Sequence, residues 1–233
     1  MKRFYKTAGV SATEGGYAVE LDGRPVKTPA KKFLGVPGQA LAAAIAAEWD
    51  AQGDDIDAHS MRLTRLANSV IDRVVEHRDS VIDEIAGYAE TDLVCYRATE
   101  PAELARRQEE GWAPLVSWIR ERHNVDFEVT TSLLPVAQGK NCIETIRSAV
   151  ADFDVFALAG LHLVTVCSGS VVIGLAVAAA RIDGPAAWEL SLIDETYQIE
   201  EWGEDPEATK RRAGLLDDIV AGAAFLQLCG TTG

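Results

Sequence analysis

The stretch Val155–Ala180, VFALAGLHLVTVCSGSVVIGLAVAAA, is the most apolar part of the chain and decides its fold class. An apolar run of this length could span a membrane, which takes about 20 uninterrupted apolar residues. Here His162 and Thr165 interrupt the run, and Cys167-Ser168-Gly169-Ser170 divides it into two segments that are each too short to cross. The stretch therefore predicts a helical hairpin buried inside the protein, without membrane insertion.

Segments with apolar side chains at helical spacing lie on both sides of this hairpin. They predict helices near residues 38–52, 60–76, 78–90, 101–123, 185–202 and 206–229. Pro114 is expected to kink or split the fourth of these helices, because proline has no backbone N–H to donate. The last two helices meet at Gly203-Glu204-Asp205-Pro206, where Gly ends one helix, Asp caps the next and Pro occupies its first turn. We expect a tight corner there.

The N-terminal region has a different pattern. Glu14-Gly15-Gly16 and Asp22-Gly23 are turn signals beside short runs of aromatic and branched residues, which predicts β-hairpins across residues 2–36. From Gly38 onward the apolar period changes from two to about 3.6. We therefore predict an α+β protein with a small β-hairpin-rich N-terminal domain at residues 1–37 and a helical C-terminal domain at residues 38–233. A short extended piece at 125–136 would return toward the N-terminal strands.

The chain of 233 residues contains 22 Lys and Arg against 36 Asp and Glu, a formal net charge of −14. This charge repels phosphate backbones and anionic headgroups, so nucleic acids and membrane surfaces are not expected partners. The charge is unevenly distributed, because residues 1–40 hold seven Lys and Arg against three Asp and Glu. The two regions should therefore meet partners differently.

Motifs for catalysis or cofactor binding are absent from the sequence. It contains no phosphate-binding loop, dinucleotide-binding turn, nucleophile elbow or H-E-x-x-H pair. The cysteines form no C-x-x-C pair and the histidines have no ligand spacing, which favours free thiols in a reducing compartment over a metal or redox site. The basic N-terminus has no apolar core behind it and is not a signal peptide, so we expect a cytoplasmic protein without metal, cofactor or catalytic residues.

The acidic residues near the C-terminus are the main anomaly. Residues 189–207 contain eight Asp and Glu and no Lys or Arg. At helical spacing Glu195 projects from the middle of an apolar stripe made by Trp188, Leu192, Ile199 and Trp202, so we expect it to be partly buried. Such a carboxylate needs a cation, for which the candidates are Arg62, Arg65 and Arg97.

The roles of these acids stay open at this point. Glu195 either ties its helix to the core through an arginine or faces a partner or ligand. Glu204 and Asp205 either cap the last helix or contact a partner.

Three further residues are expected to be structural. Asp92 and Arg97 belong to the segment Tyr88–Arg97, where a link from Asp92 to Arg97 or to the backbone would hold a helix end, the alternative being recognition of a partner. Trp49 lies late in an alanine-rich helix and should anchor that helix against its neighbours.

Several of these segments together resemble the chaperone family that assembles the catalytic F(1) head of F-type ATP synthases by holding the unassembled alpha subunit. The resemblance spans nearly the whole chain. It departs from the family pattern at Trp112-Ala-Pro-Leu115, where the family tends to read Trp-Asp-Pro-Leu, and at Ala58, where proline is common. It rests on Arg3-Phe-Tyr-Lys6, Leu21-Asp-Gly-Arg-Pro-Val-Lys-Thr-Pro29, Glu48-Trp49-Asp50 with Gln52, Tyr88-Ala-Glu-Thr-Asp-Leu-Val-Cys-Tyr-Arg97, and Asp194-Glu195 with Gln198 and Trp202-Gly-Glu-Asp205.

The resemblance implies an ATP-independent, non-enzymatic chaperone whose client is the alpha subunit. Mitochondrial relatives carry a transit peptide, whereas the pattern here begins at residue 3, which implies a bacterial cytoplasmic member; we expect a monomer. The expected partner-binding residues are Glu195, Glu201, Trp202, Glu204 and Asp205. Two alternatives remain: a hydrolase using paired carboxylates at Glu195 and Glu201, and a structural subunit of a larger complex.

Overall fold

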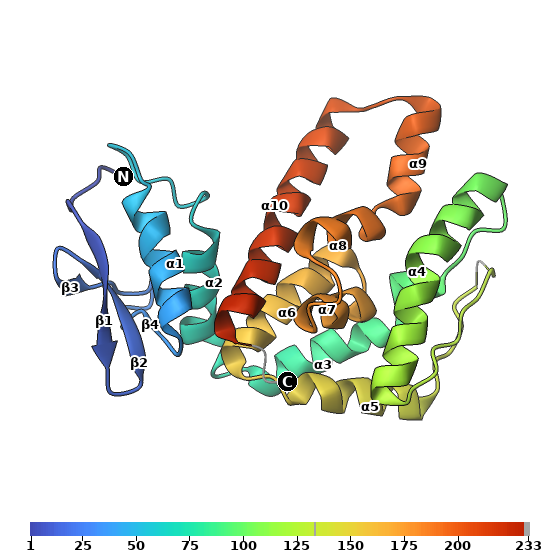
Figure 1. Cartoon of the computed structure of the whole chain (residues 1–233), viewed down its shortest axis with the longest axis horizontal. Helices are drawn as coiled ribbons and strands as arrows, with labels where there is room; N and C mark the ends of the chain where they lie inside the picture. The colour runs from blue at the N-terminus through green and yellow to red at the C-terminus, as the bar shows by residue number, and fades with distance from the viewer. Residues whose placement is uncertain (133, 231–233) are drawn as a thin grey trace.

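A computed structural model describes residues 1–132 and 134–230 of the chain. A small antiparallel sheet lies at one end of the molecule and the helices follow it toward the other end (Figure 1). This arrangement confirms the predicted α+β class.

The sheet has β2 (Gly16–Leu21) at its centre. Strand β1 (Ala8–Thr13) pairs with one side of β2 over its full length, from Ala8 opposite Leu21 to Thr13 opposite Gly16. The short strands β3 (Arg24–Pro25) and β4 (Gly35–Val36) pair with the other side. Both turns predicted from glycine therefore join neighbouring strands.

Helix α1 (Gln39–Asp50) packs against β1 and β2. Its Leu41 and Ile45 are fully buried in the same apolar cluster as Val19 and Leu34 of the N-terminal region. Apolar packing thus continues across the boundary that we placed at residue 37, and the division into two domains there stays a prediction.

Of the extended piece expected at residues 125–136, the described residues 125–132 and 134–136 do not return to this sheet. Its backbone instead forms a single parallel bridge between Thr130 and Tyr96, with Thr130 N–H donating to the Cys95 carbonyl at 2.8 Å and Arg97 N–H donating to Thr130 at 2.8 Å. The alternation of Val125 and Phe127 that suggested a strand reflects their burial beside the helices. That part of the prediction was wrong.

The remaining regular structure is helical. An α-helix and a π-helical turn replace the helix predicted at 60–76, and two 3-10 turns follow the third helix. The elements are α2 (Arg62–Ser69), η1 (Val70–Val74), α3 (Arg78–Gly87), η2 (Tyr88–Thr91), η3 (Leu93–Cys95), α4 (Ala102–His123), α5 (Lys140–Ala151), α6 (Val155–Ser168), α7 (Val171–Ala178), α8 (Gly184–Ser191), α9 (Ile193–Trp202) and α10 (Pro206–Cys229).

The apolar stretch forms the predicted buried hairpin. Its two arms are α6 and α7, and every residue of α7 is buried. Ser170 caps α7 by accepting a hydrogen bond from the Ile173 N–H at 3.0 Å. No helix in the described parts of the chain is both long enough and apolar enough to cross a membrane.

Two helices differ from prediction for identifiable reasons. Helix α4 continues through Pro114; the proline is exposed, so water can satisfy the carbonyl that loses its helical partner. The helix predicted at 185–202 breaks at Leu192 into α8 and α9. There the indole N–H of Trp112 donates to the Leu190 carbonyl at 2.8 Å, which removes that carbonyl from the helical ladder.

Asp92 fastens η3 to the start of α7. Its fully buried carboxylate accepts hydrogen bonds from the Ser170 hydroxyl at 2.5 Å, the Val172 N–H at 3.1 Å and the Val94 N–H at 3.1 Å. Of the two links considered for Asp92, the structure has the one to the backbone and not the one to Arg97. Burial raises the pKa of this carboxyl to about 6, against the lowering effect of its hydrogen-bond donors.

This buried carboxyl should make stability depend on pH. Its pKa is about 6 in the folded protein and 3.8 as an ordinary aspartate, so the folded state binds more protons between those values. Its contribution is therefore fully present below pH 4 and is lost as the pH rises through 6. We expect the free energy of unfolding of the wild type, relative to Asp92→Asn, to rise by about 2 kcal/mol from pH 7 to pH 4.5. Urea titrations of both proteins measure this difference, and a constant difference would contradict the assignment.

Candidate functional site

The C-terminal helices form a projecting arm, which we define as residues 193–212. It comprises α9, the corner at 203–205 and the first turns of α10, and it extends away from the helical body at the top of Figure 1. Most side chains from Gln198 to Arg211 are exposed. The arm therefore presents the acidic sequence segment to solvent.

The corner of the arm has the predicted caps. Gly203 ends α9 with a φ of +92°, which favours glycine. The Asp205 carboxylate accepts hydrogen bonds from the N–H groups of Glu207 at 3.4 Å and Ala208 at 3.3 Å, and so caps α10. Glu204 accepts a hydrogen bond from the Thr209 hydroxyl at 2.7 Å while remaining exposed.

Glu195 is partly buried, as predicted, but its cations are not the ones expected. The carboxylate, 23% exposed, accepts a hydrogen bond from Arg211 and lies 3.7 Å from Nη1 of Arg212, both on α10. The helix following the tight corner supplies these cations because it runs back alongside α9.

The three arginines proposed from sequence as partners of Glu195 do not fill that role. Arg62 pairs with Asp217 and Asp218 on α10, and Arg97 donates to the carbonyls of Val94 and Gln108. No ion pair of Arg65 occurs in the described residues.

Arg212 holds the two helices of the arm together from inside. Its guanidinium is 12% exposed, donates to the Thr196 hydroxyl at 2.9 Å and lies 5.0 Å from the ring centroid of Trp188. The Trp188 indole in turn donates to the Arg212 carbonyl at 3.1 Å. The arm is thus fixed by a buried cation with partners on α8 and α9.

The base of the arm is bound to α4 through the buried Gln108. Its amide N–H₂ donates to Asp194 of α9 at 2.5 Å, and its amide oxygen accepts a hydrogen bond from the Ala98 N–H at 2.6 Å. Arg97 donates to the Gln108 carbonyl at 2.7 Å. Arg97 thus contacts Gln108 and not Asp92, and its role as a structural residue stays a prediction. Sequence reasoning missed the role of Gln108, whose place on an apolar stripe was the available signal.

The tip of the arm carries an exposed aromatic side chain. Trp202 is 79% exposed, although its spacing placed it on the apolar stripe of α9. It lines an open cleft of about 530 Å³ between α9 and α10 together with Glu195, Ile199 and Asp205. Glu201 lies outside this cleft and is exposed, and it forms no hydrogen bond or ion pair within residues 1–132 and 134–230.

Trp49 lies at the other end of the molecule. Its ring packs edge-on against Tyr5 with centroids 5.7 Å apart, and the Tyr5 hydroxyl donates to the Trp49 carbonyl at 2.6 Å. Trp49 thus has its aromatic contact with the N-terminal segment, and its expected role of anchoring the helix against neighbouring helices stays a prediction. Both rings line a cleft of about 610 Å³ with Phe4 and Val26.

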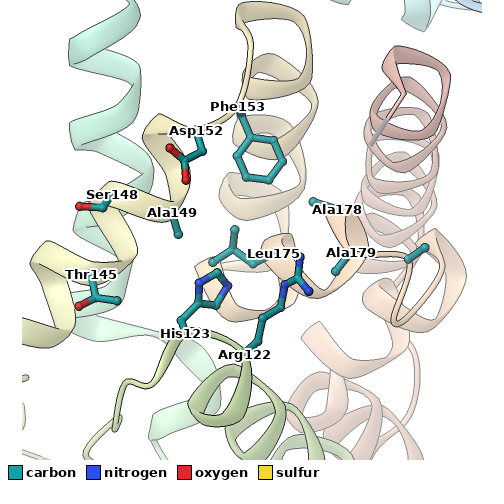
Figure 2. Close-up of a pocket in the computed structure, with 11 residues that line it drawn as sticks. Arg122, His123, Thr145, Ser148, Ala149, Asp152, Phe153, Leu175, Ala178 and Ala179 are labelled. Atoms are coloured by element: carbon teal, nitrogen blue, oxygen red, sulfur yellow. The ribbon is translucent and has the colours of Figure 1, made fainter. Parts of the chain in front are cut away.

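A larger cleft, of about 710 Å³, contains none of the predicted residues. Figure 2 shows Arg122 and His123 at the end of α4, facing Asp152 on the far side of Leu175. Burial, and then the charge of Arg122, lowers the pKa of His123. In the described residues no hydrogen bond joins His123 to a carboxylate or hydroxyl group, so the cleft presents no nucleophile and base in contact.

The chemistry of the arm favours binding over proton transfer. Oε2 of Glu195 accepts a hydrogen bond from Arg211, and Oε1 lies 3.7 Å from Arg212 without a hydrogen bond. Glu201 is not among the residues that line the cleft, so the structure does not bring together there the two acids that the hydrolase alternative pairs. Within the described residues, no group of three or more His, Cys, Asp or Glu side chains is arranged to hold a metal ion.

Removing the charge of Glu195 should destabilise the arm. Glu195→Gln keeps the shape but leaves the guanidinium of Arg212 without its carboxylate, which should cost about 1–3 kcal/mol and lower the Tm by several degrees. Glu200→Gln is the matched control, because Glu200 pairs with Arg107 at 2.7 Å in a solvated position. Thermal melts that show equal loss for both variants would contradict the internal role of Glu195.

Comparison with known proteins places this architecture in a family. The family described as "ATP12 chaperone protein" matches residues 2–120. The mitochondrial protein atp12 of Schizosaccharomyces pombe is 23% identical over 98% of this chain and 82% of its own length.

Two solved structures have the same fold, each with a TM-score of 0.93. Atp12 from Paracoccus denitrificans is 42% identical, with 98% of each chain covered. The Atu1473 protein of Agrobacterium tumefaciens is 35% identical, over 97% of this chain and 85% of that chain. On the family match and the 42% identity over nearly the whole length, the chain belongs to the ATP12 chaperone family.

Proposed function

We propose that this protein is an ATP-independent chaperone that binds the unassembled alpha subunit of the F(1) sector and shields its subunit interface until the neighbouring subunit replaces it. The ATP12 chaperone family is a family of F(1)-ATP synthase assembly factors. The observation that carries our proposal of how the client is bound is the exposed Trp202, which lies among acidic residues at the tip of the arm.

Trp202 has the properties of an interface anchor. Tryptophan is enriched among residues that dominate binding energy, because its large ring buries much apolar area and loses few rotamers. An indole that is 79% exposed contributes little burial free energy in the free protein. It can gain about 25 cal/mol per Å² of apolar surface when a client covers it.

The acids at the tip would select a basic client surface. Glu201 and Glu204 are both exposed beside Trp202, and no arginine or lysine forms an ion pair with either of them in the described residues. Their negative field speeds association with a positively charged surface and repels anionic ones. We therefore assign client contact to Glu201, Trp202 and Glu204.

Glu195 and Asp205 serve the same function by shaping the arm. Glu195 joins α9 to α10 through its two arginines, and Asp205 starts α10. Changes at these two residues should reduce client binding by disturbing the arm and not by removing a contact.

The proposal includes a monomer that acts without nucleotide in the bacterial cytoplasm. The sequence has no phosphate-binding loop through which hydrolysis could drive release. A bacterial origin is supported by the 42% identity to the Paracoccus denitrificans protein. The alternative, a structural subunit of a larger complex, can be distinguished from a chaperone. A structural subunit stays in the finished complex, whereas a chaperone is absent from it.

The protein should suppress aggregation of the isolated alpha subunit in the absence of ATP. Light scattering on dilution of the unfolded subunit measures this activity, with an unrelated protein of similar negative charge as the control. Added ATP should leave the protection unchanged. Equal protection by the control protein would refute a specific client site.

Substitutions at the tip should weaken client binding without changing the fold. Glu204→Lys and Trp202→Ala alter exposed side chains, so the Tm should stay close to wild type while the association rate and the affinity fall. Glu144→Lys makes the same charge change at an exposed position on α5, away from the arm in Figure 1, and should bind normally. Folded tip variants with wild-type affinity would remove the client site from the arm.

A further inference from the structure

The outer edge of the sheet is unpaired. In the β1–β2 ladder, Asp22 N–H donates to the Thr7 carbonyl at 3.0 Å, so the hydrogen-bonded positions of β1 are the odd ones. The backbone N–H and C=O groups of Ala8, Val10 and Ala12 consequently point away from β2. None of them has a hydrogen-bond partner in residues 1–132 or 134–230.

The hydrogen bonds on the other side of β2 support this alternation, in which the even-numbered residues of β1 point away from β2. Val19, the register partner of Val10, donates its N–H to the Leu34 carbonyl and accepts a hydrogen bond from Val26. Its backbone groups thus point away from β1, as an alternating antiparallel ladder requires. Strand β2 is covered on both sides, whereas β1 is covered on one.

Strand β1 also lacks the usual protection of an edge strand. Natural edges are shielded by charged side chains, proline, bulges or very short length. The six residues AGVSAT of β1 include no charge and no proline, and their register with β2 is continuous from Ala8 to Thr13. An open edge of this kind is a template for another strand.

The net charge of the N-terminal region selects the partner. Residues 1–40 hold seven Lys and Arg against three Asp and Glu, the reverse of the rest of the chain. Lys6, two residues before β1, is exposed and forms no ion pair in the described sequence, and the same is true of Arg24 and Lys27 on the far side of β2. A second copy of β1 would bring two net-positive regions together, which electrostatic repulsion opposes.

We propose that the free edge of β1 accepts an extended, net acidic segment of the client as an additional antiparallel or parallel strand. This inference rests on the proposed chaperone function. It adds a second contact of opposite charge, at the end of the molecule away from the arm (Figure 1). Main-chain bonds to Ala8, Val10 and Ala12 would supply affinity that depends little on client sequence.

Hydrogen exchange on the full-length protein tests the backbone geometry directly. In the free protein the amides of Ala8, Val10 and Ala12 should exchange fast and those of Gly9, Ser11 and Thr13 slowly. In the complex with isolated alpha subunit the fast set should become protected. A complex that forms while Val10 and Ala12 keep their fast exchange would overturn the inference and leave the proposed function standing, whereas absence of any complex would count against the proposed function.

Three substitutions at the exposed Ala12 separate the possible partners. Ala12→Pro removes an N–H that the fold does not use, and should weaken client binding about five- to tenfold, as for one lost hydrogen bond. Ala12→Glu should weaken binding and Ala12→Lys should preserve it. If Ala12→Pro lowers thermal stability, the comparison of client affinity between Ala12→Glu and Ala12→Lys tests the inference instead. Equal effects of Glu and Lys would overturn the acidic partner, and a dimer in sedimentation that Ala12→Pro abolishes would show a second copy as the occupant.

Discussion

The close approach of α6 and α10 is the constraint on which the helical body depends. A side-chain carbon at Gly160 of α6 would lie 2.9 Å from Leu226 and 3.1 Å from the Gly222 carbonyl, and one at Gly222 would lie 2.9 Å from Val164. The two backbones therefore meet where neither can carry a side chain, and α10 is seated in the core by Phe225. Because α10 is one continuous helix, the same packing that buries its C-terminal half determines where its N-terminal half, and hence the arm, projects.

A second set of contacts, polar in character, connects the apolar hairpin to the arm. Asp92 holds the start of α7 to η3, and Arg97, five residues further along the chain, donates to the backbone carbonyl of Gln108. Gln108 then binds Asp194 at the start of α9. Each of these groups is buried or half-buried, and leaving one unpaired costs more than the bond itself gains. These bonds join segments that lie almost one hundred residues apart in the sequence.

The sequence predicted well wherever local chemistry decides the structure. Turn glycines, the cap at Asp205 and the breaks in the apolar stretch all depend on residues that are neighbours in the chain. It predicted poorly where a distant group intervenes: the break at Leu192 depends on a hydrogen bond from Trp112, and Arg211 and Arg212 reach Glu195 only once the corner has formed. Helix α5 had no predicted counterpart, although Cys142, Ile146 and Val150 are spaced by four and buried.

The candidate site shows a further limit of periodicity. Spacing on a helix tells which side chains share a face, but it does not tell where along that face the core ends. Ile199 and Trp202 continue the stripe of α9, yet only its first part has a partner surface, since α4 covers the base of the arm and nothing in the described chain covers its tip.

The division between a braced base and a bare tip fits a chaperone that must later release its client. Exposed ion pairs contribute at most about 1 kcal/mol each and are weakened by salt, so in the proposed complex the acids of the tip would guide association more than hold the two proteins together. A rigid arm loses little conformational entropy on binding, which lets a small contact suffice. Under the proposed function that contact would be small and the arm would not need to refold, so a neighbouring subunit with a larger interface could displace the chaperone by competition alone, without nucleotide hydrolysis.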